Sequence, residues 1–400
     1  MARDPYNPPF PLGSPFQQVF YWFAWALMAT PWTLMFRWRR GDARRVPRDG
    51  PTLLVSNHTS AADPLWIAFW IRRRASFMAS VALFRVPVLG SLLPLCGCFP
   101  KAKFVSDRAS MSTLAERYAA GDVIVLFPEG TRTFDGRTQP VLPGLGRLVK
   151  RLDARVVCAR VGNGHLYQPR WARYPRWIPI RVSYDEPRTW GEDATVEDIN
   201  REISEAIRID LDDAKTDGFC WGFRLAEGLP DYLWACPQCF EPEGLAVTSE
   251  DRDCVRCAAC GAHWRLDIEN RMHGEHPLRV HEAHDRIIEH VGSPPIMDPA
   301  RHEEDKIVLR GPGALHRLAR GGGSERLHAG EVELDAAELR IRVEGEVVWR
   351  HQLSELRAVS VEMENRLTLR DQEGLLELEP QGQSSLKWGH FLKVWVTRAA

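Results

Sequence analysis

The sequence predicts an α/β domain followed by two regions of different composition. Up to about residue 214, apolar runs typical of buried strands alternate with helical stretches. Two Cys-x-x-Cys pairs then mark a small cysteine module, and from about residue 305 short runs alternate between polar and apolar residues. The fold class that we expect is therefore a mixed α/β sheet with flanking helices, a cysteine-stabilised module, and an all-β barrel with a C-terminal helix.

The expected domain boundaries follow these changes in composition. Four hundred residues are too many for one ordinary core, so two or three domains are expected. We expect a membrane-associating segment over 1–50, the α/β domain over 51–214, the cysteine module over 215–270, a linker with a short exposed helix over 271–304, and the all-β domain over 305–400.

The net charge of −1 hides two oppositely charged halves. Residues 1–190 hold 27 Lys and Arg against 12 Asp and Glu, whereas the remainder holds 25 against 41. A basic first half predicts an anionic surface or substrate. Nucleic acid is not the expected partner, because phosphate contacts need Lys and Arg, the second half is acidic, and the chain shows no recognition motif.

An aromatic, apolar segment covers residues 16–36 and is followed by the basic run RWRR at 37–40. It has the apolar length to enter a bilayer, but its two glutamines and Pro31 argue against a straight span. We expect an interfacial or re-entrant helix pair, docked on an anionic membrane by the arginines at 37, 39, 40, 44 and 45. The alternative is a buried aromatic helix of the core. Because the segment lacks the features of a secretory signal, the cytoplasmic face of the membrane is expected.

The loop SNHTSAADP, residues 56–64, follows a predicted buried strand over 52–56. Asp63 is expected to be the N-cap of a helix that begins at Pro64. The same carboxylate can hold one ring nitrogen of His58, which leaves the other nitrogen free to accept a proton. This is the base and orienting residue of a catalytic triad. The alternative is a helix cap beside a histidine that only completes a turn.

A second loop, LFPEGTRT at 126–133, follows another predicted buried strand. Gly130 allows a sharp turn, and Thr131 with neighbouring backbone N–H groups can meet phosphate oxygens. Arg132 can bind a phosphate in a bidentate manner. Glu129 cannot attract phosphate, so we expect it to orient an arginine, a hydroxyl or the loop itself. The alternative is a turn with a surface arginine.

Together, NHTSAAD and FPEGTR resemble two motifs of the glycerolipid acyltransferases of the 1-acylglycerol-3-phosphate O-acyltransferase type. Between them, Gly97 matches a Gly-x-x-Phe-x-x-Arg-like motif of that family, but Lys103 stands at the position of the arginine. VVCARV at 156–161 stands where a fourth motif usually contains a proline, and here the proline is missing. The resemblance covers about residues 20–190.

The resemblance implies a reaction without an acyl-enzyme or a catalytic metal. The donor is the thioester of acyl-CoA or acyl carrier protein. His58, oriented by Asp63, takes the proton from a lysophospholipid hydroxyl, which attacks the thioester and displaces the thiol. The substrate-binding residues that the resemblance implies are Lys103, Glu129, Gly130, Thr131 and Arg132.

The expected function is thus acyl transfer in phospholipid biosynthesis, with 1-acylglycerol-3-phosphate as the first acceptor to consider. Because Lys103 is a looser phosphate ligand than arginine, another lysolipid is the alternative acceptor. The alternative function is a membrane-bound lipid-sensing or adaptor protein, with a degenerate acyltransferase domain and a zinc-ribbon interaction module.

The cysteine module has the spacing of a four-thiolate zinc site and resembles a zinc ribbon. The expected ligands are Cys236, Cys239, Cys257 and Cys260. Cys254 makes an alternative Cys-x-x-Cys pair with Cys257, and His263 is a further candidate. We expect the zinc ion to be structural, because so small a region lacks a core of its own. The alternative is a redox or metal-free cysteine cluster.

The region after residue 305 resembles the pleckstrin-homology-like fold, in which a run of strands is followed by one helix. The strands are expected over 338–343, 346–351, 357–362, 366–370 and 375–379. The helix is expected from Ser384 or Ser385, with Trp388, Phe391, Leu392 and Trp395 on one face.

Overall fold

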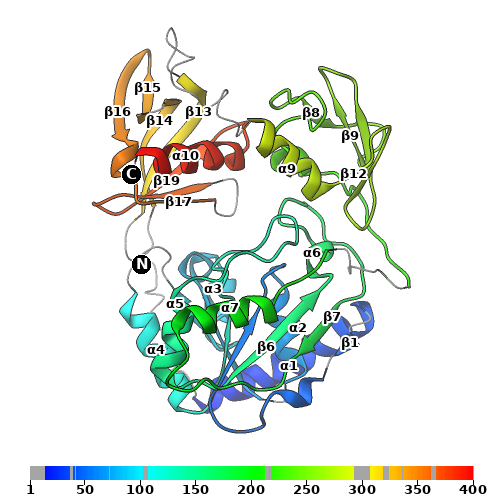
Figure 1. The fold of residues 1–400 in the computed structure, drawn as a ribbon, viewed down its shortest axis with the longest axis vertical. Helices are drawn as coiled ribbons and strands as arrows, with labels where there is room; N and C mark the ends of the chain where they lie inside the picture. The colour runs from blue at the N-terminus through cyan, green and yellow to red at the C-terminus, as the bar shows by residue number, and fades with distance from the viewer. Residues whose placement is uncertain are drawn as a thin grey trace. The chain divides into compact units, whose positions relative to one another are not determined.

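The computed structural model describes residues 14–36, 39–40, 42–71, 73–101, 107–211, 216, 218–291, 307–318, 324–335, 337–361 and 366–399. The chain divides into two compact units, residues 1–223 and 224–400 (Figure 1).

The first unit is a seven-stranded mixed sheet with helices on its faces, which confirms the expected α/β class. The strand order is β1-β7-β6-β2-β5-β3-β4, and β6 and β7 form its antiparallel pair. The strands are β1 (Arg39–Arg40), β2 (Thr52–Ser56), β3 (Ala75–Ser80), β4 (Cys98–Lys101), β5 (Val123–Leu126), β6 (Val156–Gly162) and β7 (Arg181–Tyr184). The helices are α1 (Pro15–Phe36), α2 (Asp63–Phe69), α3 (Leu89–Leu92), α4 (Arg108–Ala119), α5 (Gly144–Leu152), α6 (Gly164–Tyr167) and α7 (Val196–Ala206).

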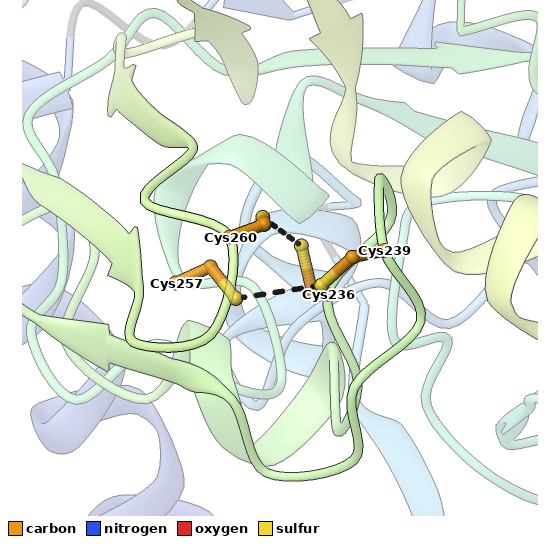
Figure 2. Close-up of side chains that lie close together, drawn as sticks. All are labelled: Cys236, Cys239, Cys257 and Cys260. Carbon is orange, nitrogen blue, oxygen red and sulfur yellow. Dashed lines mark hydrogen bonds between the residues drawn. The ribbon is translucent and has the colours of Figure 1, made fainter.

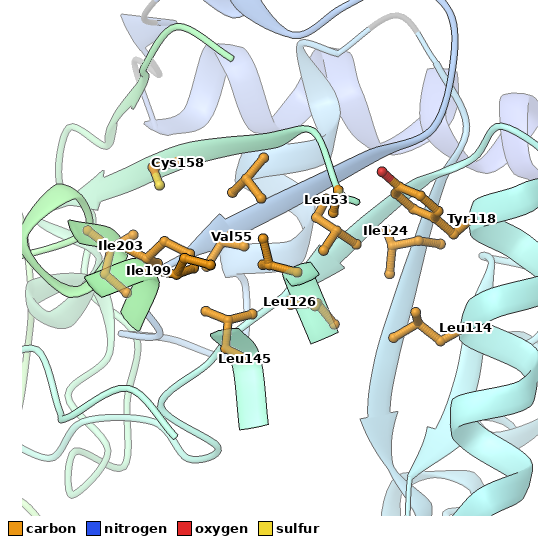
Figure 3. Packing of buried hydrophobic residues seen from close by; sticks show 14 of the residues in the cluster. Leu53, Val55, Leu114, Tyr118, Ile124, Leu126, Leu145, Cys158, Ile199 and Ile203 are labelled. Carbon is orange, nitrogen blue, oxygen red and sulfur yellow. The ribbon is translucent and has the colours of Figure 1, made fainter. Parts of the chain in front are cut away.

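The core of this unit lies between the sheet and the helices α4, α5 and α7. Alternate residues of β2 and β5 face these helices, because side chains along a strand alternate between its two faces. Figure 3 shows this layer. Its labelled members are Leu53, Val55, Leu114, Tyr118, Ile124, Leu126, Leu145, Cys158, Ile199 and Ile203. Burial of this apolar layer fixes the positions of β2 and β5, the two strands that precede the polar loops.

Strands β3 and β4 were not predicted from the sequence. β4 contains Pro100, which lacks the N–H that a central strand needs, and the strand order places β4 at the edge of the sheet, where a proline is tolerated. Gly97, just before β4, has a φ of +84°, and a Cβ there would lie 2.6 Å from the carbonyl oxygen of Ala75. This glycine therefore permits the close approach of the edge strand β4 to its neighbour β3.

The N-terminal aromatic segment forms one helix, α1, and not the expected helix pair. Its inner side is anchored by polar contacts. The Gln17 amide donates to the carbonyl of Pro94 at 2.6 Å, and the Tyr21 hydroxyl accepts the backbone N–H of Ala75 at 3.2 Å. Among the described helices, none has the length and hydropathy that a membrane span requires.

The second unit contains a five-stranded sheet and a seven-stranded sheet. The smaller, antiparallel sheet comprises β8 (Leu245–Val247), β9 (Cys254–Cys257), β10 (His263–Leu266), β11 (Arg271–His273) and β12 (Leu278–Arg279), with the helices α8 (Leu229–Tyr232) and α9 (Val280–Val291). The helix expected in the linker 271–304 is present as α9. The start of that linker differs from the expectation, because residues 271–273 and 278–279 pair as strands of this sheet.

The larger sheet is antiparallel in the order β16-β15-β14-β13-β19-β18-β17 and carries the C-terminal helix α10 (Ser385–Ala399). Its strands are β13 (Ile307–Leu318), β14 (Ser324–Asp335), β15 (Glu338–Val343), β16 (Glu346–Gln352), β17 (Ala358–Val361), β18 (Leu367–Arg370) and β19 (Leu375–Pro380). The expected all-β character of this region is confirmed. Strands β13 and β14 were not predicted, because glycines interrupt both apolar patterns and a proline also interrupts that of β13. The buried face of α10 contains Trp388, Phe391 and Leu392 as expected, and the side chain of Trp395 lies outside the described part.

Candidate active site

The sheet topology brings the two polar loops together. Strands β2 and β5 are parallel neighbours, with Val55 opposite Leu126, so the loops that follow them leave the same edge of the sheet. The backbone N–H of His58 donates to Oε1 of Glu129 at 2.7 Å. The backbone N–H of Thr133 donates to the carbonyl oxygen of His58 at 3.0 Å. Two segments about 70 residues apart in sequence therefore form one hydrogen-bonded site.

His58 and Asp63 form a hydrogen-bonded pair. Nδ1 of His58 lies 2.8 Å from Oδ2 of Asp63, whose side chain is fully buried. The same oxygen accepts the backbone N–H groups of Thr59 at 2.6 Å and Ser60 at 2.9 Å, and Oδ1 accepts the Thr59 hydroxyl at 3.0 Å. The imidazole stacks on Phe127 and is 20% exposed. The carboxylate is thus fixed by several donors, and Nε2 is the ring nitrogen that this pairing leaves available.

The expectation that Asp63 caps helix α2 was wrong. Asp63 is the first residue of the helix, and the N-cap is Ala62, which makes no side-chain capping bond. The carboxylate turns back toward the preceding loop, where it accepts the N–H groups of Thr59 and Ser60 and bonds to the imidazole. These are more hydrogen bonds than a helix cap would provide. The carboxylate therefore organises the histidine loop rather than the helix end.

Glu129 holds two loops through its two carboxylate oxygens. Oε1 accepts the N–H of His58, and Oε2 accepts the N–H of Gln139, each at 2.7 Å. Burial raises the pKa of Glu129 to about 7, and the two backbone donors partly offset this shift. The sequence left open whether Glu129 orients an arginine, a hydroxyl or the loop itself. In the structure, its hydrogen bonds go to the backbone of the loops.

The turn after Glu129 is shaped by Gly130 and supported from a distant segment by Arg170. Gly130 has a φ of +72°, a conformation that favours glycine. A guanidinium nitrogen of Arg170 donates to the hydroxyl of Thr131 at 2.8 Å and to the carbonyl oxygen of Arg132 at 3.1 Å. The same guanidinium lies 4.0 Å from the ring centre of Phe134. Burial lowers the pKa of the Arg132 guanidinium, while the negative charge of Asp63 opposes that shift.

Sequence reasoning missed Arg170 and Asn57 as contributors to the site. The Asn57 amide accepts the backbone N–H of Val161 at 2.8 Å and donates to the carbonyl of the same residue at 3.1 Å, so it ties the histidine loop to β6. Gly164, the first residue of α6, allows this helix to approach the histidine loop closely, because a Cβ there would lie 2.2 Å from the Thr59 hydroxyl. Asn57 lies in the motif NHTSAAD, directly before His58, so the sequence could have pointed to it. Arg170 lies outside both motifs, and nothing in its sequence neighbourhood indicates a role.

The structure does not place Lys103, because residues 102–106 lie outside the described part of the chain. The neighbouring Lys101 is described at the end of β4, where burial lowers its pKa. The expected role of Lys103 in phosphate binding stays a prediction.

Within the described ranges, a group of side chains close enough to hold a metal lies in the second unit. It consists of Cys236, Cys239, Cys257 and Cys260. Neither His58 nor Asp63 belongs to such a group.

Comparison with known proteins supplies independent evidence on the family that this chain resembles. Residues 38–162 match the family model described as "Acyltransferase". A chloroplastic 1-acyl-sn-glycerol-3-phosphate acyltransferase, BAT2 of Brassica napus, is 30% identical over 112 residues, which are 27% of this chain and 32% of the relative. A 1-acyl-sn-glycerol-3-phosphate acyltransferase of Limnanthes alba is 26% identical over 154 residues, which are 37% of this chain and 53% of the relative. The match thus spans about a third to a half of the length of these relatives.

Among solved structures, the chain is similar to the 1-acyl-sn-glycerophosphate acyltransferase PlsC from Thermotoga maritima. The sequence identity is 17%, the match covers 48% of this chain and 76% of that chain, and the TM-score is 0.39. This structural likeness is too weak to support a family on its own, so the similarity to acyltransferases rests on the sequence matches.

Proposed function

From the premise that residues 38–162 form a domain of the glycerolipid acyltransferase family, we propose that this chain is an O-acyltransferase of lipid biosynthesis. The proposed reaction moves a fatty acyl group from acyl-CoA or acyl carrier protein to the hydroxyl of a lysophospholipid. The first acceptor to test is 1-acylglycerol-3-phosphate, the substrate in the names of the sequence relatives.

The observation that carries the proposal is the pairing of His58 with the buried carboxylate of Asp63. Because Nδ1 bonds to Asp63, the proton on the ring sits at Nδ1 and Nε2 can act as the base. Nε2 would take the proton from the acceptor hydroxyl while the oxygen attacks the thioester carbonyl. Collapse of the tetrahedral adduct breaks the C–S bond, and the proton then passes from the imidazolium to the departing thiolate. Asp63 stabilises the imidazolium between these steps.

We assign the acceptor's phosphate to the turn over 130–132. Arg132 supplies a cation that is half-buried beside Asp63, where a charge-assisted bond to phosphate is stronger than at an open surface. Arg170 holds the turn from behind through Thr131 and the carbonyl of Arg132. Lys103 is proposed as a second cation. Glu129 is proposed to position the two loops without contacting the phosphate, because both of its oxygens accept backbone N–H groups.

We propose that the outer side of α1 docks the domain on an anionic lipid surface. Its inner side is held by Gln17, Tyr21 and Trp25, the last donating to the Phe69 carbonyl at 3.0 Å. Large apolar side chains remain exposed on this helix and on the segment before Pro94. They are Phe16, Val19, Trp22, Phe23, Leu27, Val86, Val88, Leu89 and Leu92. Such an aromatic and apolar surface suits the bilayer interface, where the lipid substrates reside.

The basic residues contribute unevenly to this docking. The Arg44 side chain is 91% exposed, and its ion pair with Asp42 at 3.5 Å lies at the surface, where such pairs are weak and a lipid headgroup can compete. Arg45 is engaged within the protein, since it donates to the Tyr184 carbonyl and pairs with Glu186, both at 2.9 Å. Arg37 and the side chains of Arg39 and Arg40 lie outside the described part.

A vesicle assay tests the docking. The double substitution Phe23→Glu with Leu27→Glu is expected to abolish binding to vesicles that contain anionic phospholipid. Val343→Glu with Val348→Glu, which changes two exposed valines of the second unit, is the matched control and should bind as the wild type does. Equal binding by both double variants would exclude α1 as the docking surface.

For residues 307–399 we propose the pleckstrin-homology-like fold with barrel closure. The support is the seven-stranded antiparallel order and the C-terminal helix whose Trp388 and Leu392 are buried. This fold does not by itself imply a lipid headgroup as ligand.

The acyl-transfer proposal is tested with the purified full chain in detergent. Acyl-CoA and acyl carrier protein are each supplied with a panel of lysolipids, for the wild type and for His58→Ala. The matched control is His263→Ala, which changes an exposed histidine of β10 in the second unit. We expect transfer by the wild type and by the control, and a nearly inactive but folded His58→Ala protein. Inactivity of the wild type with both donors and every acceptor would favour the lipid-sensing alternative.

A further inference from the structure

We propose that Cys236, Cys239, Cys257 and Cys260 bind one Zn²⁺ ion as four thiolates. Figure 2 shows the four side chains converging from two loops. All four Sγ atoms lie within 4.8 Å of one another. The Sγ atoms of Cys236 and Cys260 are 3.8 Å apart, and those of Cys239 and Cys257 are 3.7 Å apart. In a tetrahedron with Zn–S distances of about 2.3 Å, the sulfurs lie about 3.8 Å apart, so the cluster has the size of a zinc site.

The two Cys-x-x-Cys turns have the same backbone hydrogen bonds. In the first turn, the N–H of Phe240 donates to the carbonyl of Cys236 at 2.9 Å, and the N–H of Cys236 donates to the carbonyl of Glu241 at 3.0 Å. In the second turn, Gly261 donates to Cys257 at 3.0 Å, and Cys257 donates to Ala262 at 2.8 Å. Two segments with different sequences thus adopt one turn, which presents both of its cysteines to a shared centre.

The residue after each turn has a left-handed backbone. Gly261 has a φ of +77°, which suits glycine, but the equivalent residue of the first turn is Phe240, with a φ of +62°. Bulky residues rarely adopt this conformation, and it persists only where the surroundings require it. The requirement here is the turn that brings Cys236 and Cys239 to the same centre as the other pair.

The geometry also selects among the five cysteines of this segment. Cys254, which shares a Cys-x-x-Cys spacing with Cys257, lies outside the cluster, and its thiol donates to Oδ2 of Asp251 at 3.3 Å. His263 lies in β10 and is likewise absent from the cluster. The ligand set is therefore resolved in favour of Cys260 over both alternatives.

The site is structural rather than catalytic. Four protein sulfurs complete a tetrahedral zinc shell and leave no position for a water molecule or a substrate. The ion would tie the segment between α8 and β8 to the end of β9. Cys236 and Cys257 are buried, whereas Cys239 and Cys260 are exposed, so thiol reagents can reach one sulfur of each turn. The proposal is independent of acyl transfer.

Metal analysis of the purified full chain tests the site. We expect about one zinc ion per chain by elemental analysis, since one four-thiolate centre holds one ion. Cys236→Ser and Cys260→Ser should lower the zinc content to near zero. Cys254→Ser is the matched control, because it removes a cysteine of the same segment that lies outside the cluster, and it should keep the full content.

Two measurements on the unaltered chain guard against variants that fail to fold. An organomercurial thiol reagent should release the zinc, detected with a colorimetric chelator, in step with the loss of four thiols. Protein produced with Co²⁺ should show the intense visible bands of tetrahedral cobalt thiolate. Iron at the site, two disulfides with no metal, or equal zinc loss in Cys254→Ser would each overturn the proposal.

Discussion

The backbone N–H of His58 donates to Oε1 of Glu129 at 2.7 Å and joins the two loops that follow the paired strands β2 and β5. The same carboxylate holds Gln139 with its other oxygen. The loop that carries the proposed base is therefore fixed by a buried acidic residue of the proposed substrate-binding loop. The geometry of the histidine and the shape of the proposed phosphate-binding turn therefore depend on each other through this side chain.

The first prediction concerns the dependence of stability on pH. Burial raises the pKa of Glu129 from its ordinary value of 4.5 to about 7. Between these values the unfolded chain loses the proton while the folded chain keeps it, so this residue's contribution to the free energy of unfolding falls as the pH rises from about 4.5 to about 7. Such a shift corresponds to a loss on the order of 3 kcal/mol.

Chemical denaturation of the wild type and of Glu129→Gln at pH 4.5, 6 and 8 checks this prediction. The difference in unfolding free energy between the two proteins should change in favour of the variant as the pH rises, and then level off above about pH 7. A constant difference over this range would show that Glu129 titrates normally.

The second prediction concerns Asp63→Asn. The amide can still accept a backbone N–H from Thr59 or Ser60, but it carries no charge to stabilise the imidazolium of His58. We expect kcat to fall by about 10³- to 10⁴-fold, as for the equivalent change in a catalytic triad, with KM changed only a few-fold.

Steady-state kinetics beside circular dichroism separate this effect from unfolding. The control is Asp153→Asn, at an exposed left-handed position that asparagine tolerates well. A loss in kcat below tenfold for the Asp63 variant would remove Asp63 from the proposed mechanism.

The third prediction concerns Arg170, which supports the proposed phosphate-binding turn without belonging to either motif. Arg170→Ala removes the bonds to Thr131 and to the carbonyl of Arg132. Hydrogen bonds from a charged group contribute about 1.5–3 kcal/mol, so we expect kcat/KM for a phosphate-bearing acceptor to fall by about tenfold or more, mainly through KM. Arg147→Ala, at an exposed position on α5, should leave KM unchanged. An effect on kcat alone would contradict a role in holding the phosphate turn.

The fourth prediction uses two glycines as a matched pair. In Gly164→Ala the new Cβ would lie 2.2 Å from the Thr59 hydroxyl, which donates to Asp63, whereas at Gly144 no atom lies within 4 Å. Overpacking of this kind costs typically about 1–3 kcal/mol. We expect Gly164→Ala to lower both the unfolding free energy and kcat, and Gly144→Ala to change neither appreciably. If both variants behave alike in denaturation and kinetics, the close contact between Gly164, at the start of α6, and the histidine loop does not matter for stability or catalysis.

The sequence by itself determined several of the local elements and the chemistry available at their ends. The apolar run 52–56 is a strand with the predicted bounds, because five consecutive buried side chains suit the centre of a sheet. The spacing of His58 and Asp63 predicted their hydrogen bond, because five residues of loop suffice to fold one side chain onto the other. The cysteine spacing likewise identified the four side chains that converge in the second unit.

Only the tertiary structure decided what lies beside these elements. That β5 is the neighbour of β2, and parallel to it, follows from burial of the shared apolar layer and not from either strand's own sequence. The partners of Glu129, the support from Arg170 and the bond from Asn57 to β6 all join residues far apart in the chain. Spacing along a chain reports which residues share a turn or a face. Contacts between distant segments depend on the strand order, which is set by the packing of the whole sheet.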